Sequence, residues 1–431
     1  MHLWPIHTKT TGCAVQPPSI AFVESFVAGP LPLWARAAPN VALESAGTRM
    51  TSKESRNGTA RLVLLIAALS ACVGAPEPRR AQAAAAPQKP LPSRPQPTTN
   101  SWPIRQVANP PLPYQDIDQR ETPPPALVNV VRNLGQSFRG KVGIAVRRIG
   151  SDWTVAWNGN ALFPQQSVSK LWVSMTFLDA VDRGKLRLTD TTTITRNDLT
   201  LFHQPTAVLV AQKGGWTTSY SDLMRRAMTQ SDNTANDTML RAVGGPDAVR
   251  GFLARRMIKD IRFGPGERLL QSATAGLDWR QDYSIGRNFY AARAKLPMSV
   301  RVKALDNYLA NPPDGAAPAS IVQALAKLKE GDMLSSASSR LLLSIMSEAK
   351  TGPQRIKGGV PPGWSYLHKT GTGQDLPPRS TGFNDIGIMT APDGTSYAVA
   401  VMIGSTTVSI PERWALMQGV AKAIAANHEK R

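Results

Sequence analysis

The chain is organised around the stretch Phe163-Pro164-Gln165-Gln166-Ser167-Val168-Ser169-Lys170. The apolar residues that follow recur with helical spacing, so a helix is predicted from Ser167 to about Ala180. Ser167 and Lys170 would then share one helix face, with their Cβ atoms roughly 5–6 Å apart. A neutral Lys170 could accept the proton of Ser167, and the N–H groups of the first turn could hold a developing oxyanion. The stretch therefore predicts a serine nucleophile with a lysine beside it.

Two further motifs stand where they could meet this serine. Ser231-Asp232-Asn233 lies between two helical stretches, and Lys369-Thr370-Gly371-Thr372 ends a strand-like run. The nucleophile spacing and the Lys-Thr-Gly triplet each recur once, at Ser347-Glu348-Ala349-Lys350 and at Lys350-Thr351-Gly352. This second triplet follows a helical pattern and precedes a proline, which is typical of a helix C-terminus with a glycine cap. The copy at 369 ends a strand, where Gly371 would let a ligand approach the backbone, and is the copy expected in a site.

In this order the three motifs resemble the signature of class A β-lactamases and penicillin-binding proteins. The resemblance continues in Phe163-Pro164 ahead of the serine and in Asn384-Asp385-Ile386, which leads into the penultimate strand. It covers about residues 126–428 and implies a serine hydrolase that opens β-lactam rings without a cofactor.

The resemblance implies a role for each motif residue. Ser167 would be the acylated nucleophile and Lys170 its base, if partial burial and the charge of Lys369 depress the pKa of Lys170. Ser231 would pass a proton to the leaving nitrogen, and Asn233 would hold the acylamino side chain of the substrate. The substrate carboxylate would be bound by Lys369, Thr370, Gly371 and Thr372. The N–H groups of Ser167 and Thr372 would form the oxyanion hole.

A carboxylate for hydrolysis of the acyl-enzyme is predicted at Glu267, 36 residues after the serine of the Ser-Asp-Asn motif. Class A enzymes carry their water-activating Glu at about this distance on the Ω-loop, and Gln271 falls where they often have an Asn. However, Pro265 replaces the Arg of the ion pair that closes the loop. If Asp314 is the closing Asp, residues 272–312 form an insertion. A general base must lie within about 2.6–3.2 Å of its water, so the prediction depends on how Glu267 is held.

The pocket and the function both have alternatives. Arg379 and Arg413 are candidates for the arginine that assists the substrate carboxylate, and Phe202 or His203 could form an aromatic wall. A penicillin-binding D-alanyl-D-alanine peptidase relative would be acylated and deacylate slowly. A non-catalytic binding or sensor domain would keep the motifs without turnover. Hydrolysis is preferred because a carboxylate stands at position 267.

The expected fold is α+β, with a mainly antiparallel sheet flanked by helices and an inserted all-helical subdomain. Alternating strands come from both ends of the domain, with helical patterns between them. Strands are predicted at 141–149, 153–157, 365–369, 381–390 and 396–403, and further helices at 126–138, 318–330, 335–349 and 411–428. Between 262 and 318 the pattern weakens, and we expect an irregular segment with one helix at about 278–308.

The first 125 residues are expected to precede the catalytic domain, which would span 126–431. A short apolar run, preceded by basic residues and followed by Cys72, resembles a lipoprotein signal peptide at 50–72. Cys72 would then be lipidated, and the enzyme would be anchored to the envelope in the periplasm. Residues 1–49 would come from an upstream start and be unstructured. Residues 73–125 hold 14 of the 35 prolines and would form a disordered tether. The alternative is a leaderless cytoplasmic protein with a chance apolar run.

Composition argues against several other functions. The 50 Lys and Arg residues outnumber the 30 Asp and Glu residues, but they form no long basic tract with interleaved aromatic residues. We therefore expect no nucleic-acid binding, and the basic surface is compatible with anionic envelope polymers. Cys13 and Cys72 precede the domain and the five histidines lack metal-ligand spacing, so no metal site is expected. The expected partners are a small-molecule β-lactam and the membrane, and the domain is expected to be a monomer.

Overall fold

The structure, a computed structural model, describes residues 122–428. The predictions for residues 1–49, for the signal peptide at 50–72 with its Cys72, and for most of the tether at 73–125 lie outside this range. No helix within it is both long enough and apolar enough to span a membrane.

The described chain contains a five-stranded antiparallel sheet with the strand order β2-β1-β9-β8-β7. Its strands are β1 (Gly140–Arg148), β2 (Thr154–Trp157), β7 (Ser365–Gly371), β8 (Ser380–Thr390) and β9 (Ser396–Thr406). β1 pairs with β9, where Ala145 lies opposite Ala400, so strands from the two ends of the domain meet inside the sheet. The predicted α+β architecture is confirmed.

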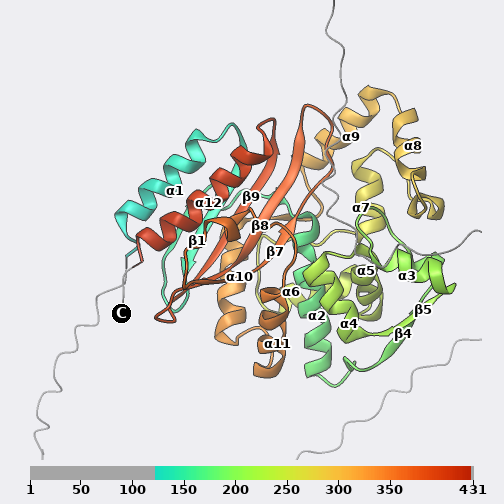
Figure 1. Cartoon of the computed structure of the whole chain (residues 1–431), viewed down its shortest axis with the longest axis horizontal. Coiled ribbons are helices and arrows are strands. Elements are labelled where there is room, and N and C mark those ends of the chain that lie inside the picture. Colours follow the sequence, from blue (N-terminus) through green and yellow to red (C-terminus); the bar gives the residue numbers. More distant parts are fainter. Residues whose placement is uncertain (1–121, 429–431) are drawn as a thin grey trace, which may run out of the picture. The chain divides into compact units, whose positions relative to one another are not determined.

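Three helices cover the two faces of this sheet: α1 (Pro125–Ser137), α12 (Ile410–Ala426) and α10 (Pro318–Glu330). Figure 1 shows α1 and α12 side by side on one face, and α10 packs against β1 and β9 on the other. Successive side chains along β1 point to opposite faces of the sheet, so the strand contributes to the core on both faces. Val142, Ile144 and Val146 enter the core under α1 and α12, while Ala145 enters the core shared with α10.

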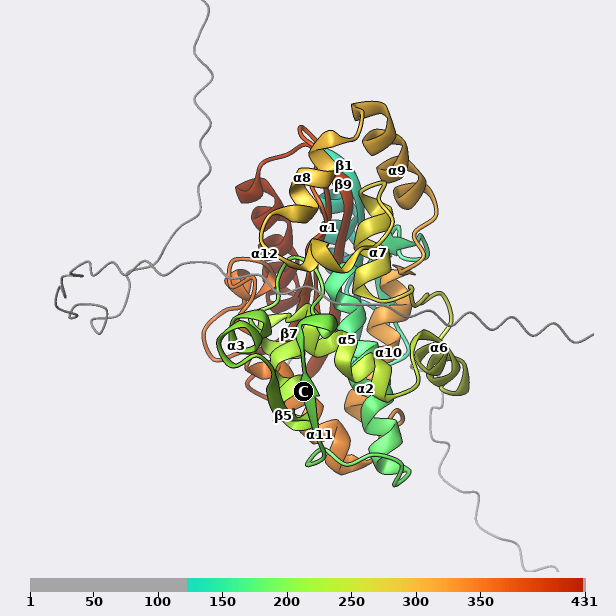
Figure 2. The ribbon, with the colours of Figure 1, turned by 90° about the vertical axis from the view of Figure 1, so that its right-hand side faces the viewer.

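The helix α2 (Lys170–Asp182) is buried at every residue from Lys170 to Ala180. Eight further helices also lie between β2 and β7 in the chain. They are α3 (Thr206–Lys213), α4 (Tyr220–Arg225), α5 (Asn233–Ala242), α6 (Pro246–Arg255), α7 (Glu267–Thr274), α8 (Asn288–Lys295), α9 (Met298–Ala310) and α11 (Ser336–Ser347). Two short antiparallel pairs accompany them, β3 (Phe163–Pro164) with β6 (Gly315–Ala316) and β4 (Thr191–Ile194) with β5 (Trp216–Ser219). Figures 1 and 2 show α7, α8 and α9 gathered at one end of this helical part.

The helix that follows the serine begins later than predicted. Residues Gln166–Ser169 form a 3₁₀ turn, and α2 begins at Lys170 rather than at Ser167. Gln166 has a left-handed backbone with a φ of 54°, which an α-helix cannot include. Ser167 therefore lies on a tight turn ahead of the helix.

The segment 262–318 is more regular than predicted, and the expectation of one helix at 278–308 is wrong. The helices α7, α8 and α9 occupy it. Each of the last two buries little, since Phe289 is the buried residue of α8 and only Leu305 and Tyr308 are buried on α9. So few apolar positions give a weak helical period in the sequence.

Candidate active site

Lys170 connects the serine to the carboxylate predicted to activate water. Its Nζ donates one hydrogen bond to Ser167 Oγ at 2.7 Å and another to Glu267 Oε1. Lys170 is fully buried, and Glu267, the first residue of α7, is only 4% exposed. The hydroxyl, the amine and the carboxylate therefore form one connected group, and the carboxylate does not point into solvent.

Glu267 is held from two further directions. Its Oε2 accepts a hydrogen bond from Nε2 of Gln271, one turn along α7, at 3.2 Å. Its backbone N–H donates to Oδ1 of Asp237 on α5 at 3.2 Å. Burial, and then the negative charge of Glu267, raises the pKa of Asp237 to about 6. Asp237 was not predicted from the sequence, because nothing near it in the chain marks it as a neighbour of Glu267.

Ser231 and Lys369 form a second pair. Lys369 Nζ donates to Ser231 Oγ at 3.0 Å and to the carbonyl of Thr370 at 2.8 Å. Burial, followed by the positive charges of Lys170 and Arg355, lowers the pKa of Lys369 well below its ordinary value. The structure thus brings together the Ser-Asp-Asn and Lys-Thr-Gly motifs.

Gly371 permits a close approach within the protein. A Cβ at this position would lie 2.3 Å from the carbonyl oxygen of Gln165, so only glycine lets β7 approach the turn that carries the serine. Nδ2 of Asn384 on β8 donates to the same carbonyl at 3.1 Å. We expected Gly371 to admit a ligand, but its close neighbour is the chain's own backbone.

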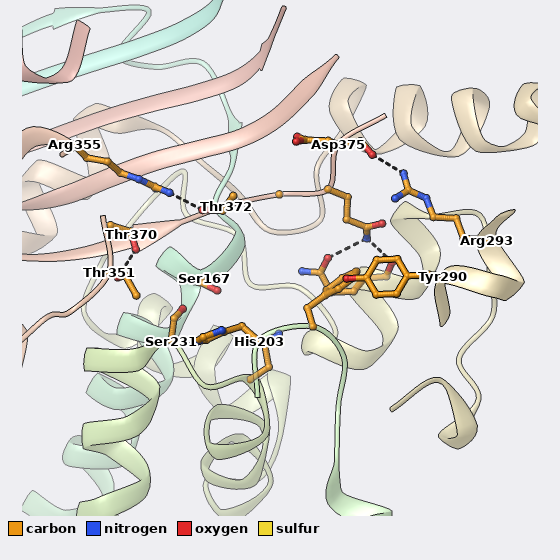
Figure 3. A pocket seen from close by; sticks show the side chains of 15 residues that line it. Ser167, His203, Ser231, Tyr290, Arg293, Thr351, Arg355, Thr370, Thr372 and Asp375 are labelled. Atoms are coloured by element: carbon orange, nitrogen blue, oxygen red, sulfur yellow. Dashed lines mark hydrogen bonds between the residues drawn. The ribbon is translucent and has the colours of Figure 1, made fainter. Parts of the chain in front are cut away.

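A pocket of about 500 Å³ opens over these groups (Figure 3). Its lining includes the predicted residues Ser167, Ser231, Asn233, Thr370 and Thr372. Phe202 and His203 line it as well, in agreement with the aromatic wall considered from the sequence. The remaining predicted residues do not line the pocket and are buried, namely Lys170, Glu267, Lys369 and Gly371.

Arg355 is the arginine beside the Lys-Thr-Gly strand. Its guanidinium donates to Thr372 Oγ1 at 2.6 Å and to the carbonyl of Gly371 at 2.9 Å, and it lines the pocket. Burial lowers the pKa of Arg355 to about 10, so the side chain remains a cation at neutral pH. No pattern in the sequence pointed to Arg355, because only the return of the chain from α11 to β7 brings it next to Thr372.

The two arginines predicted from the sequence to assist the substrate carboxylate lie elsewhere, so both predictions are wrong. Arg379 forms an ion pair with Asp306 of α9 at 2.7 Å. Arg413 donates to Ser380 Oγ at 2.9 Å. Neither arginine lines the pocket.

Asp314 closes the segment that follows Glu267, but without an ion pair among the described residues. It accepts hydrogen bonds from the backbone N–H of Gln166 at 2.8 Å and from the hydroxyl of Tyr308 at 2.9 Å. The Tyr308 hydroxyl in turn accepts from Nε2 of Gln166 at 2.5 Å. Burial raises the pKa of Asp314 to about 6. Pro265 occupies the position at which an arginine was expected. Tyr308 and Asp314 instead hold Gln166, the residue that precedes the serine.

Comparison with known proteins gives the family. A model described as the β-lactamase enzyme family matches residues 126–428. The chain belongs to this family. Its relatives include the extended-spectrum β-lactamase PER-1 of Pseudomonas aeruginosa, 28% identical over 69% of this chain and 86% of the relative. A β-lactamase of Streptomyces albus G is 26% identical over 68% of this chain and 81% of the relative.

Solved structures place this β-lactamase among the class A enzymes. A β-lactamase from Chitinophaga pinensis is 26% identical with a TM-score of 0.57, covering 70% of this chain and 99% of that chain. An ancestral class A β-lactamase is 26% identical with a TM-score of 0.56, covering 70% of this chain and 100% of that chain. The predicted fold and the predicted enzyme class, a serine β-lactamase, are confirmed.

The second Lys-Thr-Gly copy of this β-lactamase is not a helix cap. α11 ends at Ser347, and Gly352, with a left-handed φ of 65°, lies beyond its end. Thr351 lines the pocket. The copy set aside in the sequence therefore borders the site, although it does not supply the strand.

Proposed function

We propose that this β-lactamase hydrolyses the ring amide of β-lactam antibiotics through an ester on Ser167. Attack of Ser167 Oγ on the ring carbonyl would break the C–N bond, with the hydroxyl proton passing to Lys170 and Glu267. Ser231, beside Lys369, would deliver a proton to the leaving nitrogen and be reprotonated with the proton that Ser167 gave up, which leaves Glu267 a carboxylate again. A water deprotonated by Glu267 would then attack the ester carbonyl and release the ring-opened acid. The proton would return to Ser167 through Lys170.

One observation supports turnover: the buried carboxylate of Glu267 accepts a hydrogen bond from the amine of Lys170, which also donates to Ser167. Formation of an acyl-enzyme requires only the nucleophile and its proton acceptor. Hydrolysis also requires a base beside the ester, and the support for Glu267 in this role is that Lys170, which donates to Ser167, and Gln271 both donate hydrogen bonds to its carboxylate. A penicillin-binding relative with slow deacylation has no need of this carboxylate.

The remaining pocket residues would bind and polarise the substrate. The carboxylate on the lactam ring would lie against Thr370, Thr372 and Arg355, with Lys369 behind them, and Asn233 would bind the acylamino side chain. The N–H groups of Ser167 and Thr372 would form the oxyanion hole, where the loss of one donor typically costs about 10²–10³ in rate.

The test is incubation of the purified protein with a chromogenic cephalosporin. We expect steady turnover by the wild type and accumulation of a Ser167 acyl-enzyme, detected by intact mass, in Glu267→Gln. The matched control is Glu348→Gln, which removes a carboxylate from an exposed ion pair with Arg225 and should keep wild-type turnover.

Other outcomes would identify the alternatives. A single burst from the wild type, with an acyl-enzyme that persists, would point to a D-alanyl-D-alanine peptidase relative. An unlabelled Ser167 would point to a binding or sensor domain.

We also propose that lipidation of Cys72 anchors the enzyme, as a monomer, to the envelope on the periplasmic side. The support is the apolar run that ends at this cysteine. The Cys72→Ala variant should be lost from the membrane fraction. An unprocessed Met1 on the cellular protein would contradict the proposal.

A further inference from the structure

The segment 272–312, interpreted from the sequence as an insertion, contributes a wall to the active-site pocket. Tyr290 and Arg293, both on α8, line the pocket that contains Ser167. Figure 3 shows Arg293 and Arg355 toward opposite ends of this pocket, with Ser167 between them. Since Arg355 stands beside the strand proposed to bind the ring carboxylate, Arg293 faces the other part of a bound substrate.

Packing fixes α8 in this position. Phe289 is 2% exposed and shares a hydrophobic cluster with Leu201 and Tyr283. The ring of Phe202 meets that of Phe289 edge to face, with centroids 5.1 Å apart. The carbonyl of Leu201 accepts a hydrogen bond from Nδ2 of Asn233 at 2.8 Å, so one short stretch supports both the insertion and the acylamino-binding residue.

Arg293 has spare capacity to bind an anion. Its Nη2 donates to the backbone carbonyl of Asp375 at 3.0 Å, and its buried Nε has no hydrogen-bond partner among the described residues. No carboxylate within residues 122–428 forms an ion pair with it. Burial and the nearby charge of Arg301 lower the pKa of Arg293, against a smaller opposing effect of Asp375. An anion brought by the substrate would stabilise the charged form of Arg293 against both burial and the charge of Arg301.

The charges in the lining favour such a ligand. Arg293 and Arg355 are the cationic side chains of the lining, and Asp375 is its acidic side chain. Tyr290 is 48% exposed and offers an aromatic surface beside Arg293. A substrate with two acid groups could satisfy both arginines, and an aromatic group could pack between the second acid and the ring.

We propose that Tyr290 and Arg293 form a specificity subsite for β-lactams whose acylamino side chain carries an aromatic group and a second acid. The proposal rests on the proposed function and names its substrate class. It assigns the insertion a role in the choice of substrate, with no part in the chemical step.

Three penicillins that differ at one side-chain position test the proposal: benzylpenicillin without a charged group, ampicillin with an amine and carbenicillin with a carboxylate. In Arg293→Gln, kcat/KM for carbenicillin should fall by about tenfold or more, as expected for loss of a charged hydrogen bond. The value for benzylpenicillin should change by less than about twofold, and ampicillin should be hydrolysed as well or better. Arg293→Lys should retain part of the preference for carbenicillin.

The matched control is Lys295→Gln, which removes an exposed cation from the same helix outside the pocket lining. It should leave the ratio of carbenicillin to benzylpenicillin unchanged. The subsite is overturned if Arg293→Gln lowers kcat/KM equally for all three penicillins, or if Lys295→Gln has the same effect as Arg293→Gln. In either case, turnover by the wild type would still support the proposed function. A wild type that reacts with none of the three would overturn both.

Discussion

The hydroxyl oxygens of Thr351 and Thr370 lie 2.6 Å apart, so the two Lys-Thr-Gly copies of the chain meet across the edge of the pocket. Thr370 also accepts, through its carbonyl, a hydrogen bond from Lys369. The second copy therefore steadies the strand that we propose binds the substrate carboxylate.

Thr351→Val keeps the shape of the side chain and removes this hydrogen bond. We expect KM for β-lactams to rise a few-fold and the free energy of unfolding to fall by about 1 kcal/mol, because Thr370 loses a partner. Steady-state kinetics and urea unfolding give the two values. Thr193→Val is a matched control, since the Thr193 and Thr217 hydroxyls lie 2.8 Å apart on an exposed strand pair. Equal kinetics in Thr351→Val and Thr193→Val would contradict the prediction.

Arg355→Gln should raise KM for β-lactams by roughly tenfold or more, because a cation hydrogen-bonded to Thr372 is lost beside the carboxylate site. The effect should be on KM more than on kcat, because the carboxylate is bound in the ground state and the transition state alike. Arg379→Gln is the control, since its ion pair with Asp306 lies outside the pocket lining. If Arg379→Gln has the larger effect, the assignment of Arg355 is wrong.

Tyr308→Phe should lower both stability and kcat. The change leaves the buried Asp314 carboxylate and the Gln166 side chain each without one partner, which costs about 1–3 kcal/mol for a buried polar group. The turn that carries Ser167 should then be less well held. Urea unfolding and kcat are the measurements. Tyr283→Phe, in the same insertion, removes a hydroxyl that has no hydrogen bond among the described residues, and it should leave both quantities unchanged.

Stability should depend on the protonation of Asp237. Its pKa in the folded protein is about 6, raised by burial and by Glu267 from an ordinary 3.8. Between these two values the folded state holds more protons than the unfolded state, so this group's contribution to the free energy of unfolding falls as pH rises from about 4 to about 6, by on the order of 2–3 kcal/mol. Asp237→Asn retains the oxygen that accepts from Glu267 N–H and should flatten this slope in urea unfolding at a series of pH values. The shifted Asp314 would still supply its own share. An unchanged slope would refute the prediction.

The sheet and the central helix could be predicted because their patterns are local. β9 is a continuous apolar run from Tyr397 to Ile403, and α2 has an almost continuous apolar content from Leu171 onward. The three motifs were found for the same reason, since each is a short run with its own spacing.

The partners of those motifs could not be predicted in this way. Arg355, Asp237 and Tyr308 meet Thr372, Glu267 and Gln166 only after the chain has folded back on itself. The helices of the insertion were missed because they bury so few side chains that their period is faint. Sequence position alone therefore could not show that Arg355, and not Arg379, lines the pocket.

Tyr308 belongs to the last helix of the insertion, yet its hydroxyl holds the residue immediately before the nucleophile. A deletion in the gene that removed this helix would thus unseat the reactive serine. Descendants of this sequence can vary the wall formed by Tyr290 and Arg293 through point substitutions, but deleting the segment would cost them activity. The segment is in that sense difficult to lose.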